Sequence, residues 1–395
     1  MARRPSRSQS SQVAQLGAFP ATFEAKGGGT QPDAGCSSAP CPTRQGVFVF
    51  PMRRFILIAG LVVSLLAANM RPAAAGDGAP VARAIAWLHT QQRPDGGFGR
   101  PNASAGLTAD VVYVLALLGE DPAGPAWTPA GGQSALRALQ ALAPGYAAGD
   151  AGQAGKVARA VALAGGDPRN FGGLDLIATI RRAYDPATGR YHPALLYRHT
   201  LAVEALLRAG EPVPDAALQA LWRAQLADGG WFWSFDAEQS DVDTTGRVMQ
   251  VLAGHAGAWD AVAFARAAHY LCRRQLDAGG WDVGPRRGPA NADSTALAVA
   301  GLRAAGYDPQ GPAFRKAGRG AGDALLAFQE ASGAFVYVRE PGKEESRLMA
   351  TVDALTALAQ PLIRPSPARP LARWHPNRWA ERLSDWGCYR IVSSQ

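Results

Sequence analysis

The chain has 395 residues, of which 47% are hydrophobic and 18% charged, so it can bury the core of one large domain or two ordinary ones and is not a disordered chain. The formal net charge of +8 comes from the two ends, because the body between residues 76 and 363 holds 26 basic and 28 acidic residues. This even balance, without a cluster of Lys and Arg among aromatic residues, argues against nucleic-acid binding.

A secretory signal is the first element that the sequence predicts. Met52 is followed by two arginines, by an apolar run from Phe55 to Ala68, and by small residues that end at Ala75. This order is typical of a signal peptide, and the run is too short to span a membrane comfortably. We therefore predict a signal peptide at residues 52–75 and a secreted or periplasmic protein after cleavage near Ala75, with an uncleaved N-terminal anchor as the alternative.

The segment before that signal, residues 1–51, is rich in Ser, Gln, Gly and Pro and is predicted to be a disordered leader, if translation begins there at all. Two of the four cysteines, Cys36 and Cys41, lie in it. The remaining pair, Cys272 and Cys388, is too small for a disulfide framework, and no Cys or His set has the spacing of a metal site. We predict neither a metal nor a cofactor.

From residue 80 the chain alternates amphipathic helical segments with Gly and Pro turns, and no run shows the period-two alternation of a strand. A tight turn recurs in which Gln is followed by a glycine and an aromatic residue, at Gln92–Phe98, Gln225–Trp231, Gln275–Trp281 and Gln329–Phe335. The helical segments pair into six hairpins: 81–92 with 106–118, 133–142 with 152–164, 174–182 with 196–209, 214–226 with 241–253, 259–276 with 293–305, and 313–330 with 348–359.

The two helices of each predicted hairpin differ in character. Second helices such as residues 294–302 are apolar nearly all round, as expected of a buried inner layer, whereas first helices such as residues 264–274 carry more charge. Such hairpins stack into an open solenoid or close into a ring. We predict an all-α fold, an α6/α6 toroid at residues 76–363, followed by a C-terminal tail at 364–395 that contains Pro and Trp.

The recurring turns resemble the Gln-Trp motifs of the squalene cyclase and protein prenyltransferase repeat family, over roughly residues 80 to 360. The resemblance implies a terpenoid cyclase-like toroid, in which the Gln bonds free backbone groups and the aromatic side chain fills the gap between repeats. The zinc site of protein prenyltransferases is not implied, because Asp293-Ser-Thr295 lacks the cysteine of that motif.

The stretch Asp241-Val-Asp243 is similar to the Asp-x-Asp-Asp motif that supplies the general acid in class II terpene cyclases, with Thr244 in place of the last Asp. The next repeat has Asn291-Ala-Asp293 at the same place, and Asp, Asn, Ser and Thr at a helix start accept hydrogen bonds from its free N–H groups. We therefore interpret Asp241 and Asp243 first as helix starters and keep them as candidate catalytic residues. Cyclases of this type are expected to hold their site between two helical barrels, whereas this sequence predicts one.

The favoured function is binding of an apolar, isoprenoid-like ligand in the ring, with catalysis left open. Alternatives are a terpene cyclase-like enzyme, a secreted polysaccharide lyase or glycosidase with paired carboxylates, and a scaffold for a partner protein. The ligand is thus an apolar small molecule or a polymer and not a nucleic acid, while peripheral membrane contact and the oligomeric state stay open. The candidate ligand-binding residues lie at inner helix starts and after the second glycine turn: Trp231, Trp233, Phe235, Tyr197, Arg198, His199, Asp236 and Asp293.

Overall fold

The computed structural model of the chain describes residues 78–253, 260–338 and 346–361, which all lie in one compact unit, Pro72–Gln395. The predicted leader (1–51), signal peptide (52–75) and C-terminal tail (364–395) lie outside the described residues. None of the described helices is long and apolar enough to cross a bilayer.

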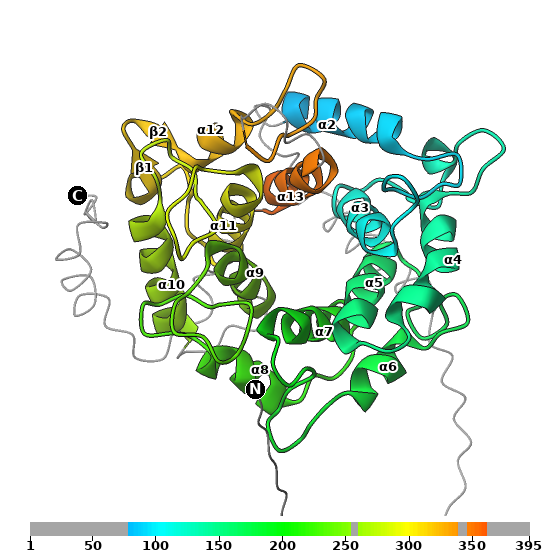
Figure 1. Ribbon diagram of the computed structural model, residues 1–395, viewed down its shortest axis with the longest axis horizontal. Helices are drawn as coiled ribbons and strands as arrows, with labels where there is room; N and C mark the ends of the chain where they lie inside the picture. The colour runs from blue at the N-terminus through cyan, green and yellow to red at the C-terminus, as the bar shows by residue number, and fades with distance from the viewer. Residues whose placement is uncertain (1–77, 254–259, 339–345, 362–395) are drawn as a thin grey trace, which may run out of the picture. The chain divides into compact units, whose positions relative to one another are not determined.

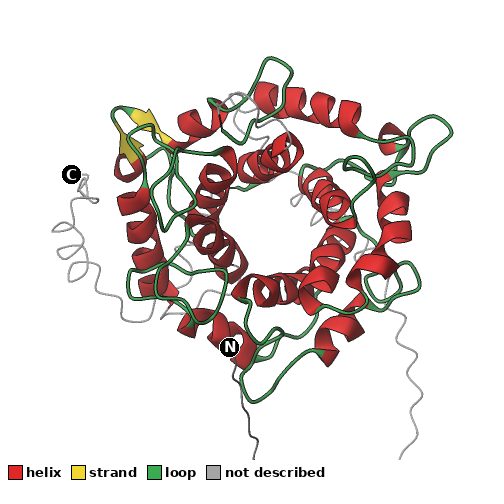
Figure 2. Cartoon of the chain, in the orientation of Figure 1, coloured by secondary structure: helices red, strands yellow, loops and turns green. Residues whose placement is uncertain are grey.

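The described chain is almost entirely helical and is arranged in two layers (Figures 1 and 2). The outer layer consists of α2 (Gly78–Gln91), α4 (Ala135–Ala147), α6 (Leu176–Arg182), α8 (Asp215–Arg223), α10 (Asp260–Arg274) and α12 (Ala321–Leu326). The inner layer consists of α3 (Ala105–Leu117), α5 (Ala151–Leu163), α7 (Leu196–Arg208), α9 (Val242–Ala253), α11 (Ala292–Ala304) and α13 (Arg347–Ala359). Short 3-10 turns, η1 (Pro125–Trp127) and η2 (Pro312–Phe314), complete the helical elements.

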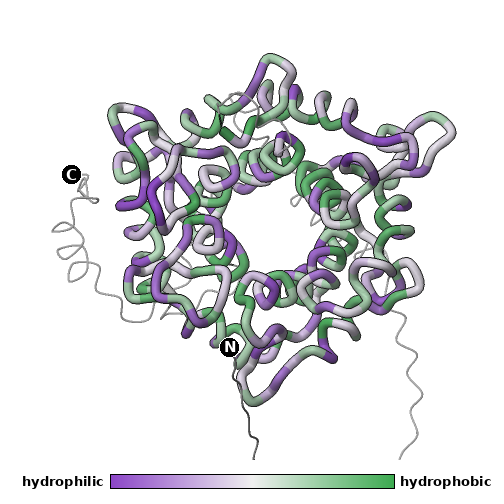
Figure 3. The backbone as a smooth tube through the Cα atoms, in the orientation of Figure 1, coloured by the Kyte–Doolittle hydropathy of each residue, from purple (hydrophilic) through white to green (hydrophobic). Residues whose placement is uncertain are grey.

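Burial explains why the chain sorts its helices into these layers. All eleven residues from Ala292 to Leu302 of α11 are buried, whereas α4 buries a single stripe at positions such as Ala135, Leu139 and Ala143. Each inner helix packs against the next along the chain, and α13 also packs against α3. Hydrophilic stretches occur on the inner helices as well as on the outside (Figure 3), so the inner layer is not purely apolar.

Glycine lets neighbouring inner helices approach each other closely. A Cβ atom on Gly246 of α9 would lie 2.2 Å from the carbonyl oxygen of Leu297 in α11, and one on Gly301 would lie 2.6 Å from the carbonyl oxygen of Gly246. No larger residue fits there without moving a backbone. This contact fixes how α9 and α11 sit beside each other, and both helices carry residues of the candidate site.

The recurring glutamine turns connect the repeats. Gln225 Nε2 donates to the carbonyl oxygen of Gly229 in its own turn and to that of Ala263 in the next outer helix, both at 2.8 Å. The last turn reaches the first helix in the same way, because Gln329 Nε2 donates to the carbonyl oxygen of Pro80 at 2.8 Å. A single side chain therefore satisfies carbonyl groups of two repeats.

The predicted helix at residues 313–330 is mostly not formed. After η2, the chain makes a two-residue antiparallel hairpin of β1 (Arg315–Lys316) and β2 (Arg319–Gly320), and only α12 is helical. Ala317 and Gly318 have φ of 46° and 82°, in the left-handed region that ends a right-handed helix. The expectation that the chain has no strand is wrong at this one place.

Candidate functional site

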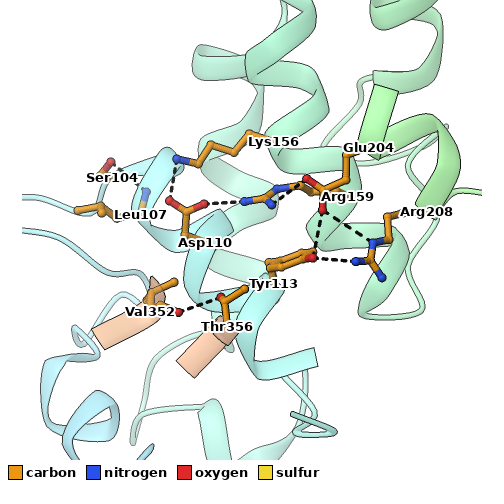
Figure 4. Close-up of polar contacts among 10 residues, drawn as sticks. All are labelled: Ser104, Leu107, Asp110, Tyr113, Lys156, Arg159, Glu204, Arg208, Val352 and Thr356. Carbon is orange, nitrogen blue, oxygen red and sulfur yellow. Dashed lines mark hydrogen bonds and ion pairs between the residues drawn. The ribbon is translucent and has the colours of Figure 1, made fainter. Parts of the chain in front are cut away.

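Charged side chains on α3, α5 and α7, of which Arg159 and Glu204 are buried, form the first of two clusters on the inner helices (Figure 4). Arg159 is at its centre, with Nη2 3.0 Å from Asp110 Oδ1 and Nη1 3.1 Å from Glu204 Oε2. Lys156 Nζ lies 2.7 Å from Asp110 Oδ2, and the Tyr113 hydroxyl donates to Glu204 Oε1 at 3.1 Å. We call these residues, with Arg208, the paired cluster.

Each acid in the paired cluster has a base beside it. Burial acts to raise the pKa of Glu204, but the charges of Arg159, Arg247 and Arg208 hold it below its usual value. Burial acts to lower the pKa of Lys156, and the Asp110 carboxylate raises it above its usual value. These residues remain charged and form ion pairs with one another, with only Arg159 Nε left without a hydrogen-bond partner in the described chain, so a structural role accounts for them.

Charged side chains on α9, α11 and α13 form a second cluster with the opposite property. It consists of Asp243, Arg247, Asp293 and Asp353, and none of the four makes an ion pair with a described residue. Three of their atoms, Asp243 Oδ1, Arg247 Nε and Asp293 Oδ1, are buried without a hydrogen-bond partner in the described part of the chain. We call these four residues the unpaired cluster.

The carboxyl groups of the unpaired cluster hold protons far above the usual pH range of an Asp. Burial raises the pKa of Asp243 to about 6, and the Ser294 hydroxyl only partly offsets this. Burial, together with the charges of Asp353 and Asp243, raises the pKa of Asp293 to about 8. Burial also raises the pKa of Asp353 to about 6, against the lowering effect of Arg247. The three carboxyl groups are therefore close enough to feel one another's charge.

Asp241 has a different role from Asp243. Its Oδ1 accepts from the Thr244 N–H at 2.6 Å, and its Oδ2 accepts from the Thr244 hydroxyl at 2.9 Å and from the Trp233 N–H at 3.1 Å. Asp241 thus caps α9, as the sequence predicts. Asp243 is already inside the first turn, where its carboxylate faces Ser294 of α11 and not the free N–H groups, so the interpretation of both aspartates as caps is wrong for Asp243.

Four of the predicted ligand residues make contacts within the fold. Trp231 is fully buried, and Phe235 is half-buried with the Arg190 guanidinium 3.8 Å from its ring centroid. His199 is fully buried, where its Nδ1 accepts from the Tyr191 N–H at 3.1 Å and burial lowers its pKa to about 4. Arg198 forms an ion pair with Asp150.

The other predicted ligand residues are more accessible, apart from Asp293. Trp233 is 51% exposed, Tyr197 is 36% exposed, and Asp236 is exposed as well. The Tyr197 N–H donates to the Trp233 carbonyl oxygen at 3.1 Å, so the two aromatic residues are neighbours at the start of α7. Tyr197 also acts on the pKa of Arg247, which places it near the unpaired cluster.

Two members of the unpaired cluster, Arg247 and Asp353, were not among the predicted site residues. Arg247 follows Asp243 by one helical turn, and this spacing is visible in the sequence. Asp353 is the one charged residue after Arg347 in the apolar segment of α13, and a lone charge on an inner helix was the available signal.

Comparison with known proteins agrees with this architecture. Residues 214–321, from the start of α8 to the first residue of α12, match the squalene-hopene cyclase N-terminal domain. The chain is similar to the squalene cyclase and terpenoid cyclase-like family. This confirms the cyclase part of the resemblance predicted from the repeated turns. No curated protein matches the sequence.

Solved structures of the type II terpene cyclase MstE share the fold of this chain. A variant of the type II terpene cyclase MstE from Scytonema, in complex with its substrate geranylgeranyl dihydroxybenzoate, is 15% identical with a TM-score of 0.50, over 72% of this chain and 97% of that chain. Another MstE variant, with its product merosterolic acid A, has the same identity and TM-score over 72% and 96%. The ent-copalyl diphosphate synthase from Streptomyces platensis is 20% identical with a TM-score of 0.43, over 65% and 50%.

The MstE chain is shorter than this one, because the alignment takes in 97% of the MstE chain and only 72% of this one.

Proposed function

We propose that this chain binds an isoprenoid-like molecule against its inner helices and that Asp243 is the acid that donates a proton to it. The observation that carries the proposal is the unpaired cluster, in which Arg247 and Asp293 are buried, Asp243 and Asp353 are half-buried, and none of the four has an ion-pair partner in the described part of the chain. Burying an unpaired charge costs several kcal/mol, roughly, so a fold has little structural reason to keep one. Such groups are concentrated at functional sites.

Proton donation by Asp243 has clear requirements that its surroundings support. An acid for an alkene or epoxide must hold its proton in a place with little water, and burial raises the pKa of Asp243 to about 6. Burial raises the pKa of the neighbouring Asp241 to about 6 as well, but three hydrogen bonds hold its carboxyl group at the start of α9. Thr244, which replaces the last Asp of the family motif, donates a hydrogen bond to Asp241.

The chemical step then needs no co-reactant. The O–H bond of the Asp243 carboxyl breaks as a C–H bond forms on the alkene, or an O–H bond on the epoxide, which leaves a carboxylate and a carbocation. Ring closure moves the positive charge along the chain, and loss of a proton from carbon ends the reaction. That proton restores the acid, so product and substrate are isomers.

The ligand class has its support in the comparisons. The MstE structures hold geranylgeranyl dihydroxybenzoate and merosterolic acid A, and they share the fold of this chain. Closure of six helical hairpins into a ring is part of the proposal. Its support is the packing of α13 against α3 and the hydrogen bond from Gln329 to Pro80.

Secretion, with a signal peptide at 52–75, a ring domain at 76–363 and a tail at 364–395, also remains a proposal. Cys272 is disulfide-bonded, which supports an oxidising compartment.

The test is turnover by the protein purified from the periplasm of an expression host. Squalene, 2,3-oxidosqualene and geranylgeranyl dihydroxybenzoate are offered separately, and extracts are analysed for a cyclised product of unchanged mass by gas or liquid chromatography with mass spectrometry. We expect the Asp243→Asn variant to bind the same substrate without converting it. Asp277→Asn, which changes an exposed turn carboxylate, is the matched control and should keep wild-type turnover. Equal turnover in Asp243→Asn would remove Asp243 as the acid, and absence of any binding would remove the ligand class.

A further inference from the structure

A pocket of about 460 Å³ lies on the outer layer, between the glycine turn that follows α8 and the helix α10. Three turn residues and three basic residues of α10 line it: Ala227, Asp228, Gly229, Arg266, His269 and Arg273. The basic residues follow one another at intervals of three and four positions, so they share one face of α10. We call this site the basic pocket. It is separate from the inner helices on which the proposed function rests.

Both arginines of the basic pocket are held against the same turn. Arg266 Nη2 donates to the Leu226 carbonyl oxygen at 2.7 Å, and Arg273 Nη2 donates to the Asp228 carbonyl oxygen at 3.0 Å. The two accepting residues are two apart in the chain, so their Cα atoms are at most about 7 Å from each other. The two arginines are seven apart on the helix, which is a rise of about 10 Å. Their side chains therefore converge on the turn, and both guanidinium groups lie at the pocket.

Two positive charges thus meet at the basic pocket without a counterion. Neither Arg266 nor Arg273 forms an ion pair within the described part of the chain, and only the Nη2 atom of each is hydrogen-bonded there. The carboxylate of Asp228 is engaged by Ser240, whose hydroxyl donates to Oδ1 at 2.5 Å and whose N–H donates to Oδ2 at 3.2 Å. An arginine has five N–H donors, so most donors of both guanidinium groups remain for a ligand.

The repeat shows that the fold does not need this set of basic residues. The last glutamine turn packs on α2 as this turn packs on α10, because in each case a turn glycine lies against the carbonyl oxygen of an arginine, Arg83 or Arg266. Arg83 is therefore the equivalent of Arg266. Three and seven positions after Arg83, where α10 has a histidine and its second arginine, α2 has Ala86 and Thr90. The basic companions are particular to α10, which favours a role toward a ligand.

We infer that the basic pocket binds a phosphate group, carried by a soluble phosphomonoester or by the head group of an anionic lipid. Each guanidinium group can donate two parallel hydrogen bonds to phosphate oxygens. A phosphomonoester carries about 1.5 to 2 negative charges at pH 7, which matches two arginines better than the single charge of a carboxylate does. Burial and the Arg273 charge lower the pKa of His269, so at pH 7 the positive charge of the pocket comes from the two arginines. The inference does not depend on the proposed function.

The first experiment measures phosphate binding by the full chain. Inorganic phosphate and glycerol 3-phosphate are titrated into the protein at pH 7 and constant ionic strength, and isothermal titration calorimetry gives the dissociation constants. Acetate is the comparison, because it offers two oxygens and one charge. We expect both phosphates to bind, and acetate to bind about tenfold or more weakly, the effect of losing charge-assisted hydrogen bonds.

A second arm identifies the source of the phosphate group. The protein is floated with vesicles of phosphatidylcholine alone and with vesicles that also contain phosphatidic acid, which carries a phosphomonoester. Flotation with the phosphatidic acid vesicles only would assign the basic pocket to a lipid head group. Binding of glycerol 3-phosphate without flotation would assign it to a soluble phosphomonoester.

Variants place the binding in the basic pocket. Arg266→Gln and Arg273→Gln should each weaken phosphate binding about tenfold or more, because each removes charged hydrogen-bond donors. Arg83→Gln is the matched control, since it removes the same charge at the equivalent place of another repeat, and it should keep the wild-type affinity. Circular dichroism of each variant checks that it is folded. Arg273 is exposed, so Arg273→Gln tests the pocket even if Arg266→Gln disturbs the turn.

Three outcomes would overturn the inference. The first is that neither phosphate binds, or that both pocket variants bind phosphate as the wild type does. The second is a loss that Arg83→Gln shares, which would show attraction to the charge of the whole chain. The third is acetate binding as tight as phosphate binding, which would show an unspecific anion contact. None of these measurements involves an isoprenoid, so each leaves the proposed function to its own test.

Discussion

Replacing Asp293 by Asn should stabilise the protein, and should do so more at pH 8 than at pH 5. Asp293 is almost completely buried without a hydrogen bond to its Oδ1, and its pKa of about 8 lies far above the usual 3.8 of an Asp. A carboxyl group whose pKa is raised by folding contributes stability at low pH that is lost as the pH rises through the folded value. Asn has the same shape and carries no charge, so it removes this pH-dependent loss.

The size of the effect follows from the two pKa values. Each pKa unit corresponds to about 1.4 kcal/mol. At pH 7, the interval between the usual 3.8 and the pH therefore limits the gain in the free energy of unfolding from Asp293→Asn to about 4 kcal/mol. Asp353 and Asp243 share protons with Asp293, and the site can relax, so we expect about 1 to 3 kcal/mol in practice. Near pH 4 the gain should be small, because the carboxyl group is protonated in the folded state and only about half ionised in the unfolded state.

The assay is urea unfolding followed by circular dichroism at pH 4, 5, 6, 7 and 8 for the wild type, Asp293→Asn and the exposed control Asp277→Asn. The difference between Asp293→Asn and the wild type should grow steadily with pH, while Asp277→Asn follows the wild type at every pH. A constant difference between the Asp293→Asn and wild-type curves would refute the reasoning, because a change in packing alone does not depend on pH. It would also mean that Asp293 is not the group that holds the extra proton.

Two further predictions concern the parts of the fold that we regard as structural. Glu204→Gln should lower the free energy of unfolding by about 3 to 5 kcal/mol, because it leaves the buried Arg159 guanidinium without one of its two carboxylates. Urea unfolding measures this change. A loss below about 1 kcal/mol would contradict the structural role of the paired cluster. Trp231→Ala should lower the free energy of unfolding by about 3 to 5 kcal/mol, since the indole is fully buried and its Nε1 donates to the Leu221 carbonyl oxygen at 2.7 Å. Trp233→Ala, at a half-exposed position, should change the melting temperature little. Equal melting temperatures for the two variants would contradict this difference in burial.

The helices were predictable because their signals are local. The predicted second helix at 293–305, for example, agrees with α11 at Ala292–Ala304, since a helix start and an apolar periodicity are both readable within one segment. The hairpin before α12 was not predictable, because it depends on the left-handed backbone at Ala317 and Gly318, and a sequence rarely marks Ala for that conformation.

The site was predictable only in part, for a physical reason. Asp243 and Asp293 stand out by their position in the repeat, but whether a buried charge has a partner depends on residues far along the chain. Arg159 forms an ion pair with Glu204, which is 45 residues away on another helix, whereas Arg247 has no ion-pair partner among the described residues. Nothing within either segment distinguishes these two arginines, and only the arrangement of the helices does.

The repeat itself separates structural from functional carboxylates. In four repeats, the side chain just before an inner helix accepts a hydrogen bond from the N–H three residues later. These accepting side chains belong to Ser104, Asp150, Asp241 and Asn291. Capping therefore explains an oxygen at this position and makes no demand on the residue two places later. That later position varies freely, and its residues in chain order are Gly106, Gly152, Tyr197, Asp243, Asp293 and Leu348. Because a glycine, a tyrosine and a leucine all occupy this position, the fold does not require a carboxylate there. Asp243 and Asp293 place carboxyl groups at this position on the adjacent helices α9 and α11, without ion-pair partners in the described chain, which favours a role toward a ligand.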